Sequence, residues 1–236
     1  MLDLLYPPEC ALCGANLTCG RALCEACDDD LPRLAEPFCQ TCVEMFPGNI
    51  DGPFACPNCS DQLFAFEFAR PAMVRDERTL DLIHRLKYAR EIHLAAELGR
   101  IARESFADPR LAPAVAGKWP LVPVPLHRKR LRHRHFNQAE EIARALAKHS
   151  GAPVLHALRR TRQTETQTLL SRKQRMGNLR GAFELTRHGR RWIDAAPEGA
   201  VIIDDVLTTG STVNECAKTL RRAGFRKIFV VTVMRG

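Results

Sequence analysis

Apolar positions recur along residues 63–236 with two different periods. Alternating or continuous apolar runs predict strands at 64–69, 121–125, 154–158, 200–203 and 228–234. Apolar stripes that repeat every three to four residues predict helices at 79–88, 93–106, 138–148 and 212–223. Residues 109–117 carry proline and glycine and are predicted to form a linker. Because strands and helices alternate, we expect an α/β fold with a mainly parallel sheet flanked by helices.

The segment before residue 63 has a different pattern and contains nine of the ten cysteines. Eight of them form four Cys-x2-Cys pairs: Cys10 and Cys13, Cys24 and Cys27, Cys39 and Cys42, and Cys56 and Cys59. One such pair places two thiolates on a metal through a tight turn, and two pairs complete a tetrahedral site. We therefore predict two structural Zn²⁺ ions. Consecutive pairs sharing one ion is the simplest assignment, and a cross-braced pairing stays open.

Disulfides and iron–sulfur clusters are the alternatives to zinc. Disulfides need an oxidising compartment, whereas the first residues, MLDLLYPPEC, show no export signal. An iron–sulfur cluster uses the same four thiolates. Four thiolates leave no open position for water, which favours a structural role for the metal. We expect Cys19 to be a bystander and Cys216 to be a small buried residue.

The net charge of +8 is concentrated in one block of the chain. Residues 118–191 contain 18 lysines and arginines against 4 aspartates and glutamates. Such a block favours a polyanionic partner, either a phosphorylated metabolite or a nucleic acid, and a solvated basic face is the alternative. No apolar run approaches the ~18 residues that span a bilayer. We therefore expect a cytoplasmic protein without membrane insertion.

The most informative stretch is VIIDDVLTTGSTV, at residues 201–213. A buried strand ends in Asp204 and Asp205, and a loop of small residues leads into a helix at the sheet edge where α/β proteins bind ligands. The residues expected to cradle a phosphate with backbone N–H groups and hydroxyls are Thr208, Thr209, Gly210, Ser211 and Thr212. The aspartates would repel a bare phosphate but suit ribose hydroxyls and Mg²⁺, so the stretch predicts a sugar-phosphate site. The alternative is a plain helix cap.

Two basic segments are expected to complete this site. The strand at 121–125 runs into a dense series of cations. Those assigned to the site are Arg128, Lys129, Arg132 and Arg134. If that strand is parallel to the one at 200–203, its cations emerge at the same sheet edge, where a pyrophosphate leaving group needs positive charge. Residues 164–183 are polar, basic and interrupted by glycine, which is typical of a lid or of an ordinary surface loop.

Residues 200–212 closely resemble the motif by which type I phosphoribosyltransferases bind phosphoribosyl pyrophosphate (PRPP). Further segments extend the resemblance, to the ComF/GntX family, over nearly the whole chain. They are the four Cys-x2-Cys pairs, Leu86-Lys87-Tyr88, Val122-Pro123-Val124-Pro125, Arg134-His135-Phe136-Asn137-Gln138, and Thr164-x2-Gln167 with Arg175-x2-Asn178-Leu179 and Phe183. Such proteins join a double zinc ribbon to a phosphoribosyltransferase domain, which implies domains at 1–62 and 63–236. The position of His135 is often glycine in the family.

The resemblance implies a set of roles. Asp204 and Asp205 would bind the ribose hydroxyls of a Mg²⁺–PRPP complex, residues 208–212 its 5′-phosphate, and the 128–134 cluster its pyrophosphate. An acceptor attacking C1 of the ribose would complete a transferase reaction, but the residues identify neither the acceptor nor a general base. The segment at 164–180 is similar to the mobile loop of glutamine amidophosphoribosyltransferases. The family is also tied to natural competence, the uptake of single-stranded DNA.

Two hypotheses compete with a transferase. A non-enzymatic sensor would bind PRPP and release no pyrophosphate, because a fold does not settle a function. A single-stranded DNA adaptor would track the phosphate backbone with the basic block and dock a competence helicase with the zinc ribbons. Platforms for single strands also stack bases on aromatic side chains. Residues 118–191 offer few of these, namely Trp119, Phe136 and Phe183.

Overall fold

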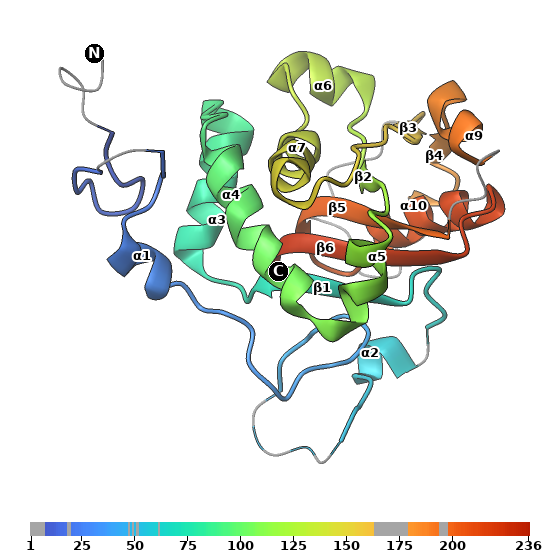
Figure 1. Ribbon diagram of the computed structural model, residues 1–236, viewed down its shortest axis with the longest axis horizontal. Coiled ribbons are helices and arrows are strands. Elements are labelled where there is room, and N and C mark those ends of the chain that lie inside the picture. The colour runs from blue at the N-terminus through green and yellow to red at the C-terminus, as the bar shows by residue number, and fades with distance from the viewer. Residues whose placement is uncertain are drawn as a thin grey trace.

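The computed structural model describes residues 8–17, 20–46, 48, 50, 52–60, 62–162, 179–193 and 198–236. At its centre lies a four-stranded sheet in the order β1–β6–β5–β2, with every neighbouring pair parallel (Figure 1). The strands are β1 (Phe68–Met73), β2 (Leu121–Pro123), β5 (Gly199–Leu207) and β6 (Lys227–Arg235). The predicted α/β fold with a parallel sheet is confirmed.

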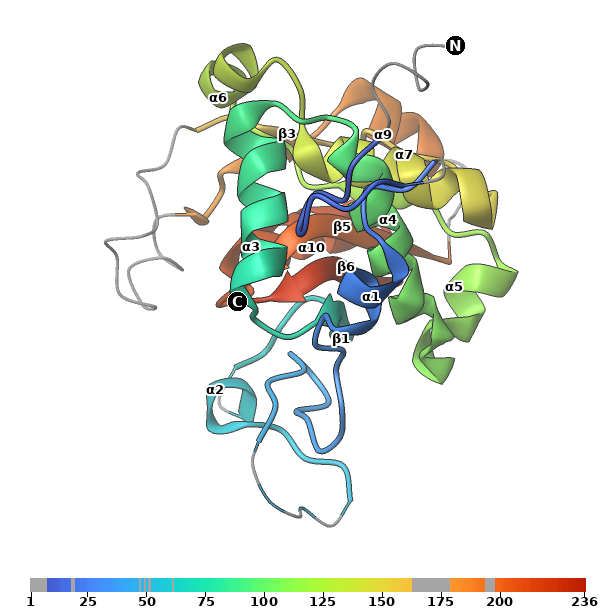
Figure 2. The same cartoon turned by 90° about the vertical axis from the view of Figure 1, so that its left-hand side faces the viewer.

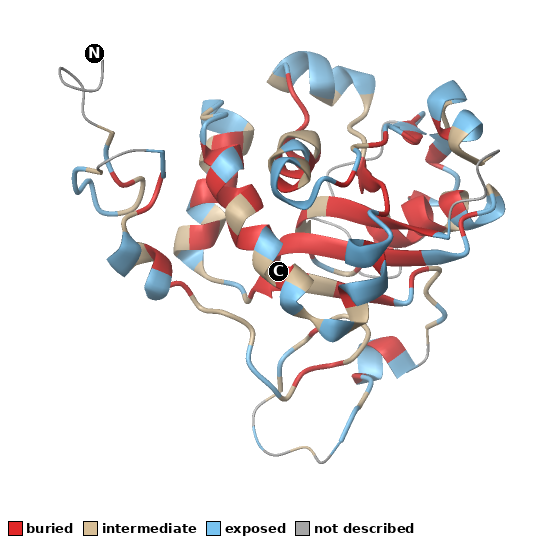
Figure 3. Cartoon of the chain, in the orientation of Figure 1, coloured by how far each residue is buried: buried red, intermediate tan, exposed pale blue. Residues whose placement is uncertain are grey.

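Helices cover both faces of this sheet. The long ones are α3 (Glu77–His84), α4 (Leu94–Arg103), α7 (Gln138–Ser150) and α10 (Ser211–Arg222). Side chains alternate along β5: Val201 and Ile203 pack in one core with α3, α4 and α7, whereas Ala200 and Ile202 pack in another with α10. Both cores are buried around the sheet, and the outer helix faces are exposed (Figure 3).

Short elements connect these layers. In the cysteine-rich segment they are α1 (Glu25–Asp29) and α2 (Pro57–Ser60). Between β1 and β2 they are the π-helix η2 (Arg85–Ala89), the 3-10 helices η3 (Glu104–Ala107) and η4 (Pro109–Leu111), and α5 (Ala112–Ala116). After β2 they are α6 (Arg128–Arg134), the antiparallel pair β3 (Leu158–Arg160) and β4 (Phe183–Leu185), and α9 (Arg187–Ile193).

Three predicted elements differ from the structure. The strand expected at 64–69 begins at Phe68 and runs to Met73. The strand expected at 154–158 is a single parallel bridge from Val154 to Leu121, followed by β3. The expected linker at 109–117 is helical in η4 and α5, because a proline in the first turn of a helix lacks only an N–H that would have no partner there. Residues 163–178, most of the expected lid, lie outside the described residues.

His135 stands where the family often has glycine, and its backbone conformation explains that preference. It ends α6 with φ of 69°, a left-handed conformation, and its N–H donates to the Leu131 carbonyl at 2.7 Å. Glycine adopts this conformation without strain, which accounts for its frequent use at this position in the family. Histidine therefore adopts at this position the same left-handed turn that glycine would adopt.

The two halves of the cysteine-rich segment contact different parts of the sheet layer (Figure 2). The first half lies beside α3 and α4, and its Leu23 and Leu31 join the core that contains Leu82 of α3. The second half lies near β1, where Ala69 N–H donates to the Thr41 carbonyl at 2.8 Å. Among the described residues, no helix combines the length and the apolar character needed to cross a bilayer.

Candidate functional site and metal centres

The loop between β5 and α10 turns sharply at Gly210. This residue has φ of 74°, which glycine adopts readily, and a Cβ added there would meet Phe64 Cε1 at 3.4 Å. The hydroxyls of Thr209 and Ser211 are hydrogen-bonded at 2.7 Å. Because α10 begins at Ser211 and is 12 residues long, the N–H groups of its first turn face the loop. The loop therefore presents the positive end of a helix to an anion.

The carboxyl groups at the end of β5 lie in different environments. Asp205 is 4% exposed and forms an ion pair with Lys87 of η2. Burial would raise the pKa of Asp205, but the charge of Lys87 and hydrogen bonds with Asp204 and Lys87 together outweigh burial and lower it. Burial, together with the charge of Asp205, raises the pKa of Asp204 well above its usual value. Asp205 is thus ionised, whereas Asp204 keeps its proton to higher pH.

A cavity of about 460 Å³ opens at this edge of the sheet. Both aspartates line it, together with four of the five predicted loop residues, Thr208, Gly210, Ser211 and Thr212. Thr209 lines a second cavity on the side of the second cysteine cluster. The first cavity also reaches side chains from distant elements: Lys87, Tyr88, Arg130, Arg134, Gln138 and Arg160.

The cations of helix α6 differ in whether they line the cavity. Because β2 is parallel to β5, α6 follows at the expected edge. Arg130 and Arg134 lie four residues apart, on one helix face, and both line the cavity. Of these two, only Arg134 was assigned to the site from the sequence. The other cations assigned to it are exposed and are not among the described lining residues: Arg128, Lys129 and Arg132.

Arg160 of β3 is a site residue that sequence reasoning missed. Its side chain is buried, lines the cavity and lies over the Phe183 ring, with 5.5 Å between the guanidinium carbon and the ring centroid. Burial lowers the pKa of Arg160. The family resemblance includes Lys87 and Tyr88 but implies no role for them. Arg160 carried no such signal, because its place in the cavity depends on the bridge between β3 and His127.

The cysteine pairs gather into two clusters of four. These are Cys10, Cys13, Cys24 and Cys27, and Cys39, Cys42, Cys56 and Cys59, with all sulfur atoms of a cluster within 4.8 Å of one another. The Sγ–Sγ distance is 3.7 Å both for Cys13 and Cys24 and for Cys42 and Cys56. A tetrahedral site with Zn–S bonds of about 2.3 Å has edges of about 3.8 Å. The residues therefore fit two zinc ions, each shared by consecutive pairs.

Cys216 belongs to neither cluster. None of the described cysteines forms a disulfide. Cys216 is fully buried in α10, as expected of a small apolar residue. Cys19 lies outside the described residues.

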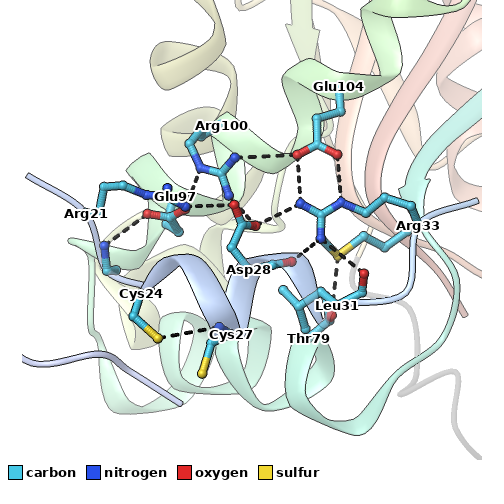
Figure 4. Close-up of polar contacts among 12 residues, drawn as sticks. Arg21, Cys24, Cys27, Asp28, Leu31, Arg33, Thr79, Glu97, Arg100 and Glu104 are labelled. Atoms are coloured by element: carbon cyan, nitrogen blue, oxygen red, sulfur yellow. Dashed lines mark hydrogen bonds and ion pairs between the residues drawn. The ribbon is translucent and has the colours of Figure 1, made fainter. Parts of the chain in front are cut away.

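A network of ion pairs joins the first cysteine cluster to α4 (Figure 4). Asp28 follows Cys27 directly and pairs with Arg33 at 2.8 Å and Arg100 at 2.5 Å. Burial would raise the pKa of Asp28, but hydrogen bonds from three arginines lower it to about 2. Glu97 of α4 accepts a hydrogen bond from the Ala22 N–H at 3.0 Å. The first cluster is thereby held against the helical layer.

The second cysteine cluster lies next to the loop of the candidate site. Arg235, at the end of β6, pairs with Glu44 of the cysteine-rich segment. The same guanidinium donates to the carbonyls of Leu207 at 2.9 Å and Thr208 at 2.8 Å. The loop is therefore supported from the side of the second cluster.

Comparisons with known proteins agree with both parts of this structure. Residues 1–60 match the family described as Double zinc ribbon domain. Competence protein F of Haemophilus influenzae is 29% identical over 224 residues, which cover 94% of each chain. The DNA utilization protein YhgH of Escherichia coli O157:H7 is 30% identical in an alignment of 248 positions that covers 98% of this chain and 99% of that protein. Competence protein ComFC of Streptococcus pneumoniae is 24% identical over 217 residues, 90% of this chain and 87% of that protein. With similarity that spans nearly both full chains, this protein belongs to the ComF/GntX family.

Proposed function

We propose that this protein binds PRPP, or a related ribose 5-phosphate, as a phosphoribosyltransferase-family protein of the ComF/GntX type. The observation that carries the proposal is a single cavity lined by a helix-start loop, a carboxyl pair and several cations. A phosphate suits the loop, hydroxyls suit the carboxyl pair, and a second phosphate group suits the cations. PRPP combines these three groups in one molecule.

Each part of the cavity has a role in this proposal. Thr208 to Thr212 hold the 5′-phosphate through backbone N–H groups and hydroxyls. Asp205, already ionised, accepts a hydrogen bond from one ribose hydroxyl, and Asp204 binds the other. Arg130, Arg134 and Arg160 balance the charge of the pyrophosphate. Thr209, Arg128, Lys129 and Arg132, which do not line the cavity, are then expected to contribute less than the lining residues.

The carboxyl pair also fits Mg²⁺, because hard cations take carboxylate oxygens and substrate phosphates as ligands. Bound with PRPP, Mg²⁺ would supply positive charge to the pyrophosphate. In the proposed reaction the lone pair of an acceptor forms a bond to C1 of the ribose. The C1–O bond breaks, its electron pair leaves with pyrophosphate, and the acceptor loses a proton. The protein's part is to position the partners and to stabilise the leaving charge.

The proposal divides the chain into two domains. We assign residues 1–62 to a double zinc ribbon and residues 63–236 to the phosphoribosyltransferase-like domain. Clusters of cysteine thiolates are typical of a reducing compartment, which supports action in the cytoplasm. The names of the relatives refer to competence and DNA utilization, and we extend that role to this chain as part of natural competence or DNA uptake.

A second candidate function is the handling of single-stranded DNA. It is favoured by exposed cations that the cavity does not use, on α6 and on α9: Arg128, Lys129, Arg132, Arg187, Arg190 and Arg191. These charges suit a phosphate backbone. The few aromatic residues of the basic block, Trp119, Phe136 and Phe183, are all buried, so DNA binding would be electrostatic and steeply dependent on salt. A competence helicase is the protein partner proposed for the zinc ribbons.

Calorimetric titration of PRPP with Mg²⁺ tests the proposal. Zinc-loaded wild type should bind PRPP, and the Asp204→Asn/Asp205→Asn variant should lose that binding while staying folded. If wild type binds, pyrophosphate release in the presence of acceptors separates a transferase from a PRPP sensor. Absence of binding to folded, zinc-loaded wild type would reject the PRPP site and leave DNA handling as the first candidate.

A further inference from the structure

The backbone at the start of the loop between β5 and α10 separates two cavities. Leu207, Thr208 and Gly210 line both the first cavity and the second cavity, which has a volume of about 370 Å³. Arg235, at the end of β6, lines the second cavity and is not among the described lining residues of the first. Its side chain is 13% exposed. Any effect of Arg235 on a ligand in the first cavity must therefore pass through the loop backbone.

The Arg235 guanidinium holds two successive carbonyl groups of this backbone. Its Nη1 donates to the Leu207 carbonyl at 2.9 Å and to the Thr208 carbonyl at 2.8 Å. The Leu207 carbonyl also accepts a hydrogen bond from the Gly236 N–H at 2.8 Å. Among the described residues, Arg235 is the only donor to the Thr208 carbonyl. Both carbonyls therefore point toward β6 and the second cavity, and the direction of the Thr208 carbonyl depends on Arg235 alone.

The direction of these carbonyls fixes the direction of the N–H groups that follow them. A peptide unit is planar and trans, so its C=O and N–H groups point in opposite directions. The N–H groups of Thr208 and Thr209 therefore point away from Arg235. Because β5 lies between β6 and β2, they point to the side of β2, where Thr208 lines the first cavity. Neither N–H has an acceptor among the described residues, so both are available to an anion.

We propose that Arg235 is a positioning residue for the 5′-phosphate of the ribose ligand. By holding two carbonyls on the side of the second cavity, it keeps the N–H side of the loop turned toward the phosphate. Without the guanidinium, the Thr208 carbonyl is free to rotate toward the first cavity, where its negative end would face the phosphate oxygens. Arg235 itself does not touch the ligand. The inference rests on the proposed function, because that function places the phosphate on this loop.

The chemistry of the guanidinium suits this role. Its planar fork carries several donors in fixed directions, whereas a lysine ammonium is a flexible point charge. In Arg235 the fork is divided between two tasks: Nη1 donates to the loop carbonyls, and Nη2 pairs with Glu44 of the cysteine-rich segment. The pair with Glu44 holds the guanidinium from its other side, so the loop carbonyls meet a donor that is itself held in place.

Calorimetric titration of ribose 5-phosphate into the full zinc-loaded chain tests this role. Arg235→Met should weaken binding about 10-fold, which corresponds to the loss of one well-directed hydrogen bond to a charged group. Arg235→Lys should recover part of the affinity, because an ammonium still donates to a carbonyl but lacks the fixed fork. Urea unfolding of both variants checks that they are folded under the conditions of the titration.

The matched control is Arg110→Met. Arg110 also joins the cysteine-rich segment to the helical layer, since it donates to the Gln40 carbonyl at 2.8 Å and pairs with Asp108 at 2.7 Å. It is not among the described lining residues of either cavity. Whatever it costs in stability, Arg110→Met should leave the affinity for ribose 5-phosphate as in wild type.

An NMR measurement on wild type tests the direction of the N–H group without any variant. The amide proton resonance of Thr208 should move downfield when ribose 5-phosphate is added, because its N–H then donates to the phosphate. A Thr208 resonance that stayed in place while ribose 5-phosphate bound would overturn the inference, even if Arg235→Met failed to fold.

The titrations separate the failure of this inference from the failure of the proposed function. Unchanged affinity in Arg235→Met would overturn the role of Arg235 and leave the ribose-phosphate site standing. Equal losses in Arg235→Met and Arg110→Met, or no recovery in Arg235→Lys, would also overturn it, because the side chain would then only hold the cysteine-rich segment in place. If folded, zinc-loaded wild type did not bind ribose 5-phosphate, the proposed function itself would fail, and the role of Arg235 with it.

Discussion

Replacement of Lys87 by methionine should destabilise the protein, because it leaves Asp205 buried without its countercharge. The Lys87 side chain is 17% exposed, so water can replace little of the lost ammonium. Asp204 offers no compensation, since burial and the charge of Asp205 already raise its own pKa. Removal of one partner from a buried ion pair costs about 3–5 kcal/mol, and we expect Lys87→Met to fall in this range at neutral pH.

Urea unfolding of zinc-loaded protein measures this cost as a shift of the midpoint at unchanged slope. The matched control is Lys227→Met on β6, which breaks an exposed pair with Glu198 at 3.4 Å. We expect the control to cost less than about 1 kcal/mol. The double variant Lys87→Met/Asp205→Asn should recover most of the stability, because no buried charge is left unpaired.

The reasoning would be refuted if Lys87→Met cost no more than Lys227→Met. Asp205 would then not depend on Lys87 for its charge, and the two carboxyl groups would not differ as described. A cost that the double variant failed to recover would instead mean that Lys87 stabilises η2 by its aliphatic chain.

Four other perturbations address the rest of the structure. Glu97→Gln should cost about 3–5 kcal/mol in urea unfolding, because it breaks the buried network that holds the first cysteine cluster. Cys39→Ser should halve the zinc content measured by metal analysis and lower the melting temperature, since the second cluster loses a ligand. The contribution of Asp204 to the free energy of unfolding should be fully present below its unfolded pKa of 3.8 and be lost as pH rises through its raised folded pKa. Asp204→Asn should therefore make the free energy of unfolding, measured by urea unfolding at several pH values, vary less with pH. Glu44→Gln should weaken calorimetric binding of ribose 5-phosphate, because it releases the guanidinium that supports the loop.

Each expectation has an outcome that contradicts it. Glu198→Gln breaks an exposed pair with Lys227 and is the control for Glu97→Gln, so equal costs would remove the case for the network. Full zinc content in Cys39→Ser would mean that three thiolates suffice. A stability-against-pH curve that Asp204→Asn left unchanged would exclude a raised pKa. Unaltered ribose 5-phosphate affinity in Glu44→Gln would show that the second cluster does not support the loop.

The parts of the structure that the sequence predicted are those encoded by neighbouring residues. The strand, the two aspartates and the loop at 201–212 are continuous in the chain, so their geometry follows from local rules for strand ends and helix starts. The Cys-x2-Cys spacing is equally local, because a tight turn fixes two thiolates on one metal. The parallel alignment of the strands at 121–125 and 200–203, stated from the sequence only as a condition, is met by the pairing of β2 with β5, so the residues after β2 lie at the expected edge.

What the sequence did not predict depends on contacts between distant residues. Lys87 reaches Asp205 across 118 positions, and nothing near Lys87 in the chain indicates a carboxylate partner. Residues 128–134 are so rich in charge that they show no apolar stripe, and no helix is predicted there from the sequence. Without a helix, the sequence could not indicate that Arg130 and Arg132 lie on different helix faces. Arg160 reaches the cavity because its backbone forms a parallel β-bridge with His127, and no local sequence pattern predicts this bridge. Tertiary contacts, rather than weak local signals, account for these gaps.

The position of the second cysteine cluster gives its metal a role beyond holding a short segment together. A zinc site replaces the apolar core that so few residues cannot build. Here that segment also carries Glu44, whose pair with Arg235 lies against the carbonyls of Leu207 and Thr208. Phe64, directly after the cluster, contacts the position of Gly210 from the same side. A metal-bound segment on this side of the loop therefore helps to hold the backbone N–H groups of the loop in a fixed direction.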